Sequence, residues 1–433
     1  MEYRVERDSM GEINVPCEAF WGAQTQRSFQ NFPRDVEKMP IQQIYAITMI
    51  KKACAVCNAK CGKLDEDRKD AIVKACDEIL SGKWDNQFPL TVWQTGSGTQ
   101  TNMNVNEVIA HVGNEIAGEK ILHPNDHVNM SQSSNDVFPA AMYLNTSIQV
   151  SRNLLPAIEK MIEALEKLEE ENQDLIKCGR THLQDATPVT LGQEISGWKE
   201  MIKSDYEAVK TALSSVLMLP IGGTAVGTGL NAPKNFDEFV TSELAEFTGL
   251  EIKPLKNKFY GLASKGGFVM FHSALKTLAT DVYKIASDIR LLSCGPRCGI
   301  GELIIPANEP GSSIMPGKVN PTQVESITMI SIQVIANDVA ISMANTQGQL
   351  QLNVYMPLMI YNMQQSVELL YKGLECFTKN LLEGLKANRE VIEYNLGNTL
   401  MLVTALSPKI GYDNAAKIAK YAYENNITLK ESA

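Results

Sequence analysis

The spacing of apolar residues constrains the fold of this chain most, because it follows a helical period from about residue 41 onward. Its clearest run steps by four, three, four and three positions through Leu154, Ile158, Met161, Leu165 and Leu168. Such spacing places the side chains along one side of a helix, as in the seam of a helical bundle. Strand-like alternation is confined to short pieces such as residues 3–5 and 301–305. The sequence therefore predicts an all-α fold of long helices with a small mixed region at its start.

Turn and cap residues give approximate bounds for these helices. We expect the helix that holds the run to begin after Asn135 and Asp136, to take Pro139 in its first turn, to kink at Pro156 and to end near Ile176. Further long helices are expected at residues 188–218, 262–292, 322–345 and 351–383. Three domains follow: a mixed N-terminal domain (1–133), a central long-helix bundle (134–389) and a small helical C-terminal domain (390–433).

The segment 322–345 is apolar on almost every side, so it is expected to be buried all round. A membrane span would also fit its length, but polar residues interrupt the run: Ser331, Gln333, Asn337 and Asp338. We therefore expect this helix at the centre of an oligomer rather than in a membrane.

The composition excludes several classes of protein. With 44% hydrophobic and 21% charged residues among 433, the chain is an ordinary soluble protein. A net charge of −10 argues against nucleic acid or an anionic membrane as a partner. The start shows no signal or transit segment, and the nine cysteines lack disulfide spacing, so a cytoplasmic location is expected. Cys54, Cys57 and Cys61 share one helix face and are expected to be buried small residues rather than metal ligands, so no metal site is predicted.

The segment from Gly311 to Pro321 reads Gly-Ser-Ser-Ile-Met-Pro-Gly-Lys-Val-Asn-Pro and is the strongest candidate for chemistry. Its glycines and prolines permit turns in which backbone N–H groups converge on an anion, and Lys318 adds a positive charge beside them. Asn320 is expected to cap the following helix, with Gln323 completing a capping box. A loop anchored at one end in this way is typical of a lid.

Further polar segments lie between the helices, at residues 95–102, 123–126, 131–136 and 179–188. Hydroxyls and amides of this kind recognise carboxylates, although some of them also serve as helix caps. Capping explains neither Lys318 nor His182. Because His182 lies in a predicted loop, where imidazole can titrate near neutrality, it is a candidate catalytic residue. His123 is a weaker candidate, and the remaining three histidines are expected to be structural.

The length of the expected helix limits which of these loops can meet. A continuous helix from 137 to 176 spans roughly 60 Å at about 1.5 Å per residue. Residues 133–135 and 179–187 would then lie at opposite ends of one subunit. A single site that uses both must therefore be assembled between subunits.

Several motifs, in order along nearly the whole chain, resemble those of the aspartase/fumarase superfamily. The form Pro-Gly-Lys-Val-Asn-Pro-Thr-Gln at 316–323 is similar to class II fumarases in particular. The other matching motifs are Gly96-Ser-Gly-Thr-Gln100, His123-Pro-Asn-Asp126, Ser133-Ser-Asn-Asp136, Gly179-Arg-Thr-His-Leu-Gln-Asp185 and Gly222-Gly-Thr-Ala-Val-Gly-Thr-Gly229.

The resemblance implies a homotetramer around a twenty-helix core, with active sites drawn from three subunits. It implies reversible hydration of fumarate to L-malate, a tricarboxylic acid cycle reaction, without a cofactor. Ser312 would remove the C3 proton, His182 with Glu325 and a water would serve the hydroxyl side, and Lys318 would stabilise charge. The residues implied to bind substrate or water are Ser97, Gly98, Thr99, Ser133, Ser134, Asn135, Thr181, Ser313, Lys318 and Asn320. Those implied for a second anion site near the entrance are Lys120, His123, Pro124, Asn125 and Asp126.

The chain departs from the family pattern in two places. Lys120 stands where relatives often carry Arg, and the chain stops at Ala433, where fumarases usually continue, so a shortened C-terminal domain is expected. The nearest alternative is an aspartate ammonia-lyase, which tends to have Ala in place of Gly317. Argininosuccinate and adenylosuccinate lyases fit less well. A silent structural protein on the same scaffold fits poorly with Ser312, Lys318, His182 and Glu325 together.

Overall fold

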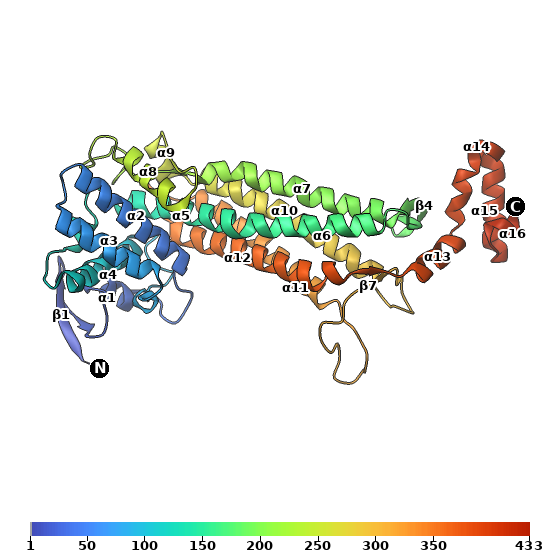
Figure 1. The fold of residues 1–433 in the computed structure, drawn as a ribbon, viewed down its shortest axis with the longest axis horizontal. Coiled ribbons are helices and arrows are strands. Elements are labelled where there is room, and N and C mark those ends of the chain that lie inside the picture. The colour runs from blue at the N-terminus through green and yellow to red at the C-terminus, as the bar shows by residue number, and fades with distance from the viewer. Residues whose placement is uncertain (1) are drawn as a thin grey trace. The chain divides into compact units, whose positions relative to one another are not determined.

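The computed structural model describes residues 2–433 and is mostly helical, with long helices and short two-stranded sheets (Figure 1). Contacts divide the chain into two compact units. Unit 1 comprises Met1–Leu154, Ala208–Lys276 and Gln333–Leu369. Unit 2 comprises Leu155–Glu207, Thr277–Ile332 and Leu370–Ala433. The domain boundaries at 133 and 389 remain predictions.

Unit 1 is built around α2 (Ile41–Lys60), which packs on α3 (Glu66–Leu80), α5 (Ser134–Gln149) and α8 (Phe236–Thr248). Ile44, Ile47 and Ile50 of α2 are fully buried in this core. Cys54 and Cys57 are also buried, as predicted, whereas Cys61 is half-buried. The other elements of this unit are the hairpin β1 (Tyr3–Asp8) and β2 (Gly11–Pro16), α1 (Ala23–Asn31), η1 (Asp85–Gln87), α4 (Thr99–Ala117), η2 (Pro124–Val128), η3 (Val150–Leu154), η4 (Ser214–Val216), the parallel pair β5 (Met218–Leu219) and β6 (Lys253–Pro254), and α9 (Lys258–Ala263).

Unit 2 contains α6 (Leu155–Glu171) and two antiparallel pairs, β3 (Ile176–Thr181) with β4 (Gln184–Thr190) and β7 (Leu303–Ile304) with β8 (Lys386–Ala387). Its smaller helices are η5 (Leu382–Gly384), α13 (Arg389–Asn398), η6 (Leu400–Ala405), α14 (Ser407–Ile410), α15 (Tyr412–Asn425) and α16 (Leu429–Ser432). Four long helices contribute residues to both units: α7 (Leu191–Leu213), α10 (Gly266–Leu292), α11 (Thr322–Asn345) and α12 (Met356–Asn380).

The helix expected from about residue 137 to about Ile176 differs from the prediction in three ways. It begins at Ser134, because Ser133 is the N-cap and forms a capping box with Asp136, so Pro139 lies beyond the first turn. It passes through a π-helical segment, η3, just before Pro156. Proline has no N–H and its ring clashes with the carbonyl four residues earlier, which a wider π turn accommodates. The helix ends at Glu171, since Ile176 already begins β3.

The apolar run that predicted this helix is confirmed as its buried side. Leu154, Ile158, Met161, Leu165 and Leu168 are all buried. Helix α11 also has the expected bounds, and among the described residues it alone is long and apolar enough to cross a membrane. The expected burial of α11 at the centre of an oligomer stays a prediction, because in the single chain one set of its apolar side chains is exposed: Met329 by 65%, Ile332 by 56%, Val339 by 61% and Met343 by 57%.

Candidate active site

The segment between Gly311 and Asn320 forms a closed loop. The N–H of Gly311 donates to the carbonyl of Lys318 at 3.1 Å, and the Asn320 side-chain amide donates to the carbonyl of Gly311 at 2.6 Å. Gly317 has a φ of +78°, a conformation that glycine adopts most readily. The expectation that Asn320 caps the next helix is wrong, because its amide closes this loop and α11 begins at Thr322.

The Ser312 side chain accepts two hydrogen bonds from the backbone of this loop. Its Oγ accepts hydrogen bonds from the backbone N–H of Ile314 at 3.2 Å and of Met315 at 3.1 Å. Backbone N–H groups aimed at one oxygen stabilise negative charge on it. The Ser312 side chain is half-buried, whereas Ser313 and Lys318 are exposed. The loop thus carries a polarised hydroxyl at Ser312 and, at Lys318, a cation that forms no ion pair among residues 2–433.

His182 lies at the tip of the β3–β4 hairpin, not in an irregular loop as predicted. Thr181 pairs with Gln184, which leaves His182 and Leu183 as a two-residue turn with φ values of 55° and 60°. Such turns normally carry glycine or asparagine, because φ is positive at both positions. Both side chains are exposed, and Leu183 is 66% exposed. The β-branched Thr187, Val189 and Thr190 are the sequence signal that could have indicated the second strand.

The predicted pairing of His182 with Glu325 is not formed within one chain. Among residues 2–433, no hydrogen bond or ion pair joins these two side chains, both of which are exposed. The nearest charged partner of Glu325 is Arg290, at 4.0 Å from its carboxylate. The two groups therefore remain available for contacts outside the chain.

The candidate substrate-binding residues of unit 1 lie together. The hydroxyls of Ser97 and Thr99 are 2.8 Å apart, and Thr99 is 2.8 Å from Ser134. Ser133 caps α5, and the Asn135 side chain donates to the carbonyl of Ala225 at 2.8 Å. The segments 97–99 and 133–135 thus form one cluster of hydroxyls at the N-terminal ends of α4 and α5, where backbone N–H groups favour an anion. Thr181, Ser312, Ser313, Lys318, Asn320 and Glu325 belong to unit 2.

Gly98 allows a test of how tightly this cluster is built. A methyl group there would lie 2.2 Å from Phe138, and φ is +70°. We expect Gly98→Ala to destabilise the protein by about 2–4 kcal/mol, from strain at positive φ and overpacking together. Gly62→Ala is the control, because Gly62 has a φ of +69° but open space around it. Thermal unfolding at one protein concentration should show a clearly larger drop for Gly98→Ala; equal drops would contradict the packing argument.

Two buried charged residues lie near this cluster: Asp136, which the sequence indicated only as a helix cap, and Lys51, which it did not single out. The Asp136 carboxylate accepts hydrogen bonds from the N–H groups of Ser133, Gly222 and Thr224 at 2.9–3.0 Å. Burial raises the pKa of Asp136, and these hydrogen bonds oppose that shift. Burial lowers the pKa of Lys51 to about 7, and its amine donates to the side-chain oxygens of Asn129 and Gln132. Lys51 could have been found from its place on the buried face of α2, four residues after Ile47.

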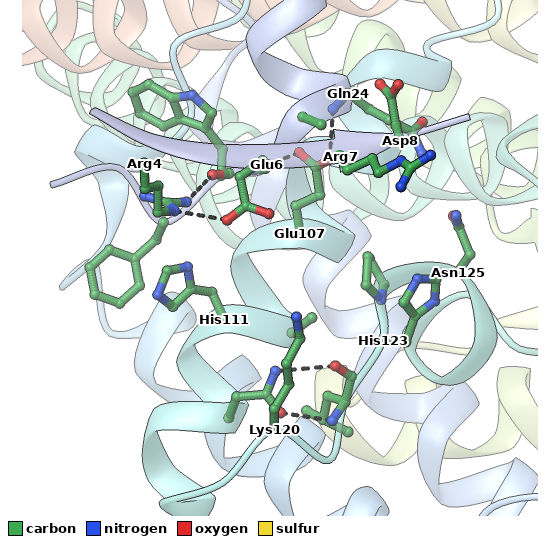
Figure 2. A pocket seen from close by; sticks show the side chains of 18 of the residues that line it. Arg4, Glu6, Arg7, Asp8, Gln24, Glu107, His111, Lys120, His123 and Asn125 are labelled. Atoms are coloured by element: carbon green, nitrogen blue, oxygen red, sulfur yellow. Dashed lines mark hydrogen bonds and ion pairs between the residues drawn. The ribbon is translucent and has the colours of Figure 1, made fainter. Parts of the chain in front are cut away.

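The residues predicted for a second anion site line a cavity of about 900 Å³ in unit 1 (Figure 2). Lys120, His123, Pro124 and Asn125 form part of its wall, together with Arg7 of β1. His123 is the N-cap of η2, and its Nδ1 lies 3.2 Å from the backbone nitrogen and from the carboxylate of Asp126. Asp126 itself lines a neighbouring cavity of about 610 Å³, beside Ser133.

Comparison with known proteins matches both parts of the chain. Residues 11–336 match a family described as lyase, and residues 402–433 match the fumarase C C-terminus. The class II fumarate hydratase of Campylobacter jejuni is 54% identical over 437 aligned positions, which cover 100% of this chain and 94% of that protein. The chain belongs to the class II fumarate hydratase family. The class II fumarate hydratase of Bacillus subtilis is 52% identical, with 100% of this chain and 95% of that protein covered.

The fold agrees with this membership. The crystal structure of class II fumarase from Schistosoma mansoni has a TM-score of 0.97 and 44% identity, covering 100% of this chain and 95% of that one. The predicted superfamily is thus confirmed, and so is the mainly helical fold with long helices. The number of helices in an assembled core stays a prediction, as do the roles of the individual site residues.

Proposed function

We propose that this class II fumarate hydratase adds water to fumarate, reversibly giving L-malate, by acid–base chemistry at sites shared between subunits of a homotetramer. One observation carries the proposal: the Ser312 hydroxyl lies in a closed loop and receives two backbone N–H groups. The full-length similarity to proteins named fumarate hydratase class II supports the reaction.

Ser312 is proposed as the base that takes the C3 proton of L-malate. Removing a proton beside a carboxylate moves negative charge onto that carboxylate, so the site must hold the developing charge. A serine is a poor base until its alkoxide is stabilised. The N–H groups of Ile314 and Met315 provide that stabilisation at 3.1–3.2 Å, and the free amine of Lys318 adds a cation on the same loop.

His182 is proposed to handle the hydroxyl group. Loss of hydroxide from C2 needs a proton donor, and imidazole can both give and recover a proton near neutral pH. Glu325 would orient the imidazole, with a water between them. Because the two side chains form no hydrogen bond or ion pair among residues 2–433 and both are exposed, the arrangement supports a pair formed between subunits.

The exposed apolar side of α11 supports assembly. Four large apolar side chains on one helix, at positions 329, 332, 339 and 343, are more than half exposed in the single chain. Surfaces of this kind are normally covered by another protein surface. A homotetramer would cover them, and the cytoplasmic location expected from the sequence remains a prediction.

The remaining candidates are proposed to bind the substrate carboxylates. Ser97, Gly98, Thr99, Ser133, Ser134, Asn135, Thr181, Ser313, Lys318 and Asn320 would contribute hydroxyls, amides, backbone N–H groups and one cation. The cavity beside Lys120 and His123 supports a second anion site, since Lys120 and Arg7 line it and form no ion pair among residues 2–433.

An assay with two substrates tests the function. The purified protein is expected to consume fumarate and form L-malate, which loss of the fumarate ultraviolet band follows directly. It should release no ammonia from L-aspartate, because the loop carries Gly317 and not the alanine typical of ammonia-lyases. Ammonia release from aspartate, or no turnover of fumarate, would overturn the assignment.

A further inference from the structure

The two residues of the hairpin turn, His182 and Leu183, do not themselves fix the position of the His182 imidazole. His182 and Leu183 both have positive φ, a strained conformation for residues other than glycine. No hydrogen bond or ion pair holds the His182 side chain within residues 2–433. The position of the imidazole is therefore set by what fixes the strands below the turn.

A buried carboxylate fixes one of these strands. The guanidinium of Arg180, two residues before His182 on β3, donates to both oxygens of Glu302, at 2.7 and 3.1 Å. Lys177, earlier on β3, lies 3.0 Å from the same carboxylate and 2.7 Å from Glu194. The bidentate contact between Arg180 and Glu302 fixes the direction of the guanidinium as well as its distance from the carboxylate. The Glu302 side chain is 1% exposed, so water does not compete for these bonds.

Glu302 is itself held at a fixed point of unit 2. Its backbone N–H donates to the carbonyl of Leu292 at the end of α10, and its carbonyl accepts from the N–H of Asn388. The next two residues form β7, which pairs with β8. The side-chain amide of Asn395 on α13 donates to the Glu302 carboxylate at 3.0 Å. The carboxylate thus ties β3 to α13, and the Glu302 backbone fixes that carboxylate to the end of α10 and to Asn388.

The charges in this cluster balance. Burial alone would raise the pKa of Glu302, but the hydrogen bond from Arg180 and the charge of Lys177 lower it below its usual value. Glu302 is therefore ionised and, with Glu194, offsets Lys177 and Arg180. Replacing the carboxylate by an amide would leave Arg180 without one acceptor and turn an N–H₂ group toward two cations, which favours movement of β3.

We propose that Glu302 is a positioning residue for the hydration reaction: it fixes the direction of β3 through Arg180 and so places the His182 imidazole at the site. The inference rests on the role proposed above for His182. Glu302 need not touch the substrate, because a small displacement of an acid–base group costs much of its effect.

A double-mutant cycle between Glu302 and His182 tests this proposal. With His182 present, Glu302→Gln should lower kcat at least about tenfold and change KM less than about threefold, since Thr181 is the one proposed carboxylate-binding residue on β3 and the others lie on other segments. In a His182→Asn background, the same substitution should change kcat less than about twofold, because no imidazole is left to misplace. Equal losses in both backgrounds would show general damage and overturn the proposal.

A control variant and a replacement variant make the result of the double-mutant cycle interpretable. Glu169→Gln removes a carboxylate that pairs with Lys199 at 2.6 Å in the same unit, and it should leave kcat within about twofold. If Glu302→Gln does not fold, Arg180→Lys replaces it in the cycle, because lysine keeps the charge but lacks the fork that contacts both oxygens. A normal kcat for His182→Asn alone would instead refute the proposed function of His182, and a normal kcat for folded Glu302→Gln would refute this inference.

Discussion

Ser312→Ala is expected to lower kcat for fumarate hydration by at least about a hundredfold, the usual scale for a positioned acid–base group. The change removes the only oxygen to which the N–H groups of Ile314 and Met315 donate in this loop, so no alkoxide can form there. His182→Asn is expected to cause a loss of the same size. Asparagine tolerates the positive φ of this turn, so the hairpin should survive the substitution.

Initial rates in both reaction directions give kcat and KM for each variant. KM should change far less than kcat, because these two groups act on the proton and the hydroxyl and not mainly on the carboxylates. Ser293→Ala is the matched control, since Ser293 is also half-buried and donates only to a backbone carbonyl. A variant of Ser312 or His182 with near-normal kcat would require that role to be assigned to another residue.

The helices could be predicted from the sequence where apolar residues recur with one period. The bounds 322–345 were predicted to the residue, because polar loop residues flank a mainly apolar stretch. The hairpin at 176–190 was missed, because its buried positions include Lys177, which reads as a surface residue. One of the two carboxylates that pair with the buried Lys177 amine belongs to Glu302, more than a hundred positions along the chain. Contacts at such separation leave no periodic signal.

Within the candidate site, too, some contacts could be predicted from the sequence and others could not. The sequence predicted that hydroxyls of segments 95–102 and 131–136 act together, and the contacts from Ser97 through Thr99 to Ser134 agree with that. It did not indicate Asp136 as the acceptor for Gly222 and Thr224, because a cap residue and a buried anchor have the same local pattern. No hydrogen bond or ion pair joins His182 and Glu325 among residues 2–433, so their pairing stays a proposal, which the shared site would place between two copies of the chain.

Mixing two inactive variants should restore activity if the site is shared between subunits. Chains with Ser312→Ala keep an intact His182, and chains with His182→Asn keep an intact Ser312. When the two are co-expressed in equal amounts and assemble at random, half of all chains supply each intact group. A site that draws the two groups from different chains then receives both in about a quarter of cases. Activity of about a quarter of the unmodified enzyme is therefore expected, far above either parent.

A site formed within one chain predicts a different restored activity, so this measurement distinguishes the two arrangements. If Ser312 and His182 act within one chain, every chain in the mixture lacks one of them and no site is restored. Co-expressing either single variant with a chain that carries both substitutions is the control, because that mixture never supplies both groups. Hybrids no more active than their parents, with tetramers confirmed by their mass in solution, would contradict the shared site. The hundredfold losses of the single variants would then have to arise inside one subunit, although among residues 2–433 no hydrogen bond or ion pair joins the exposed His182 and Glu325.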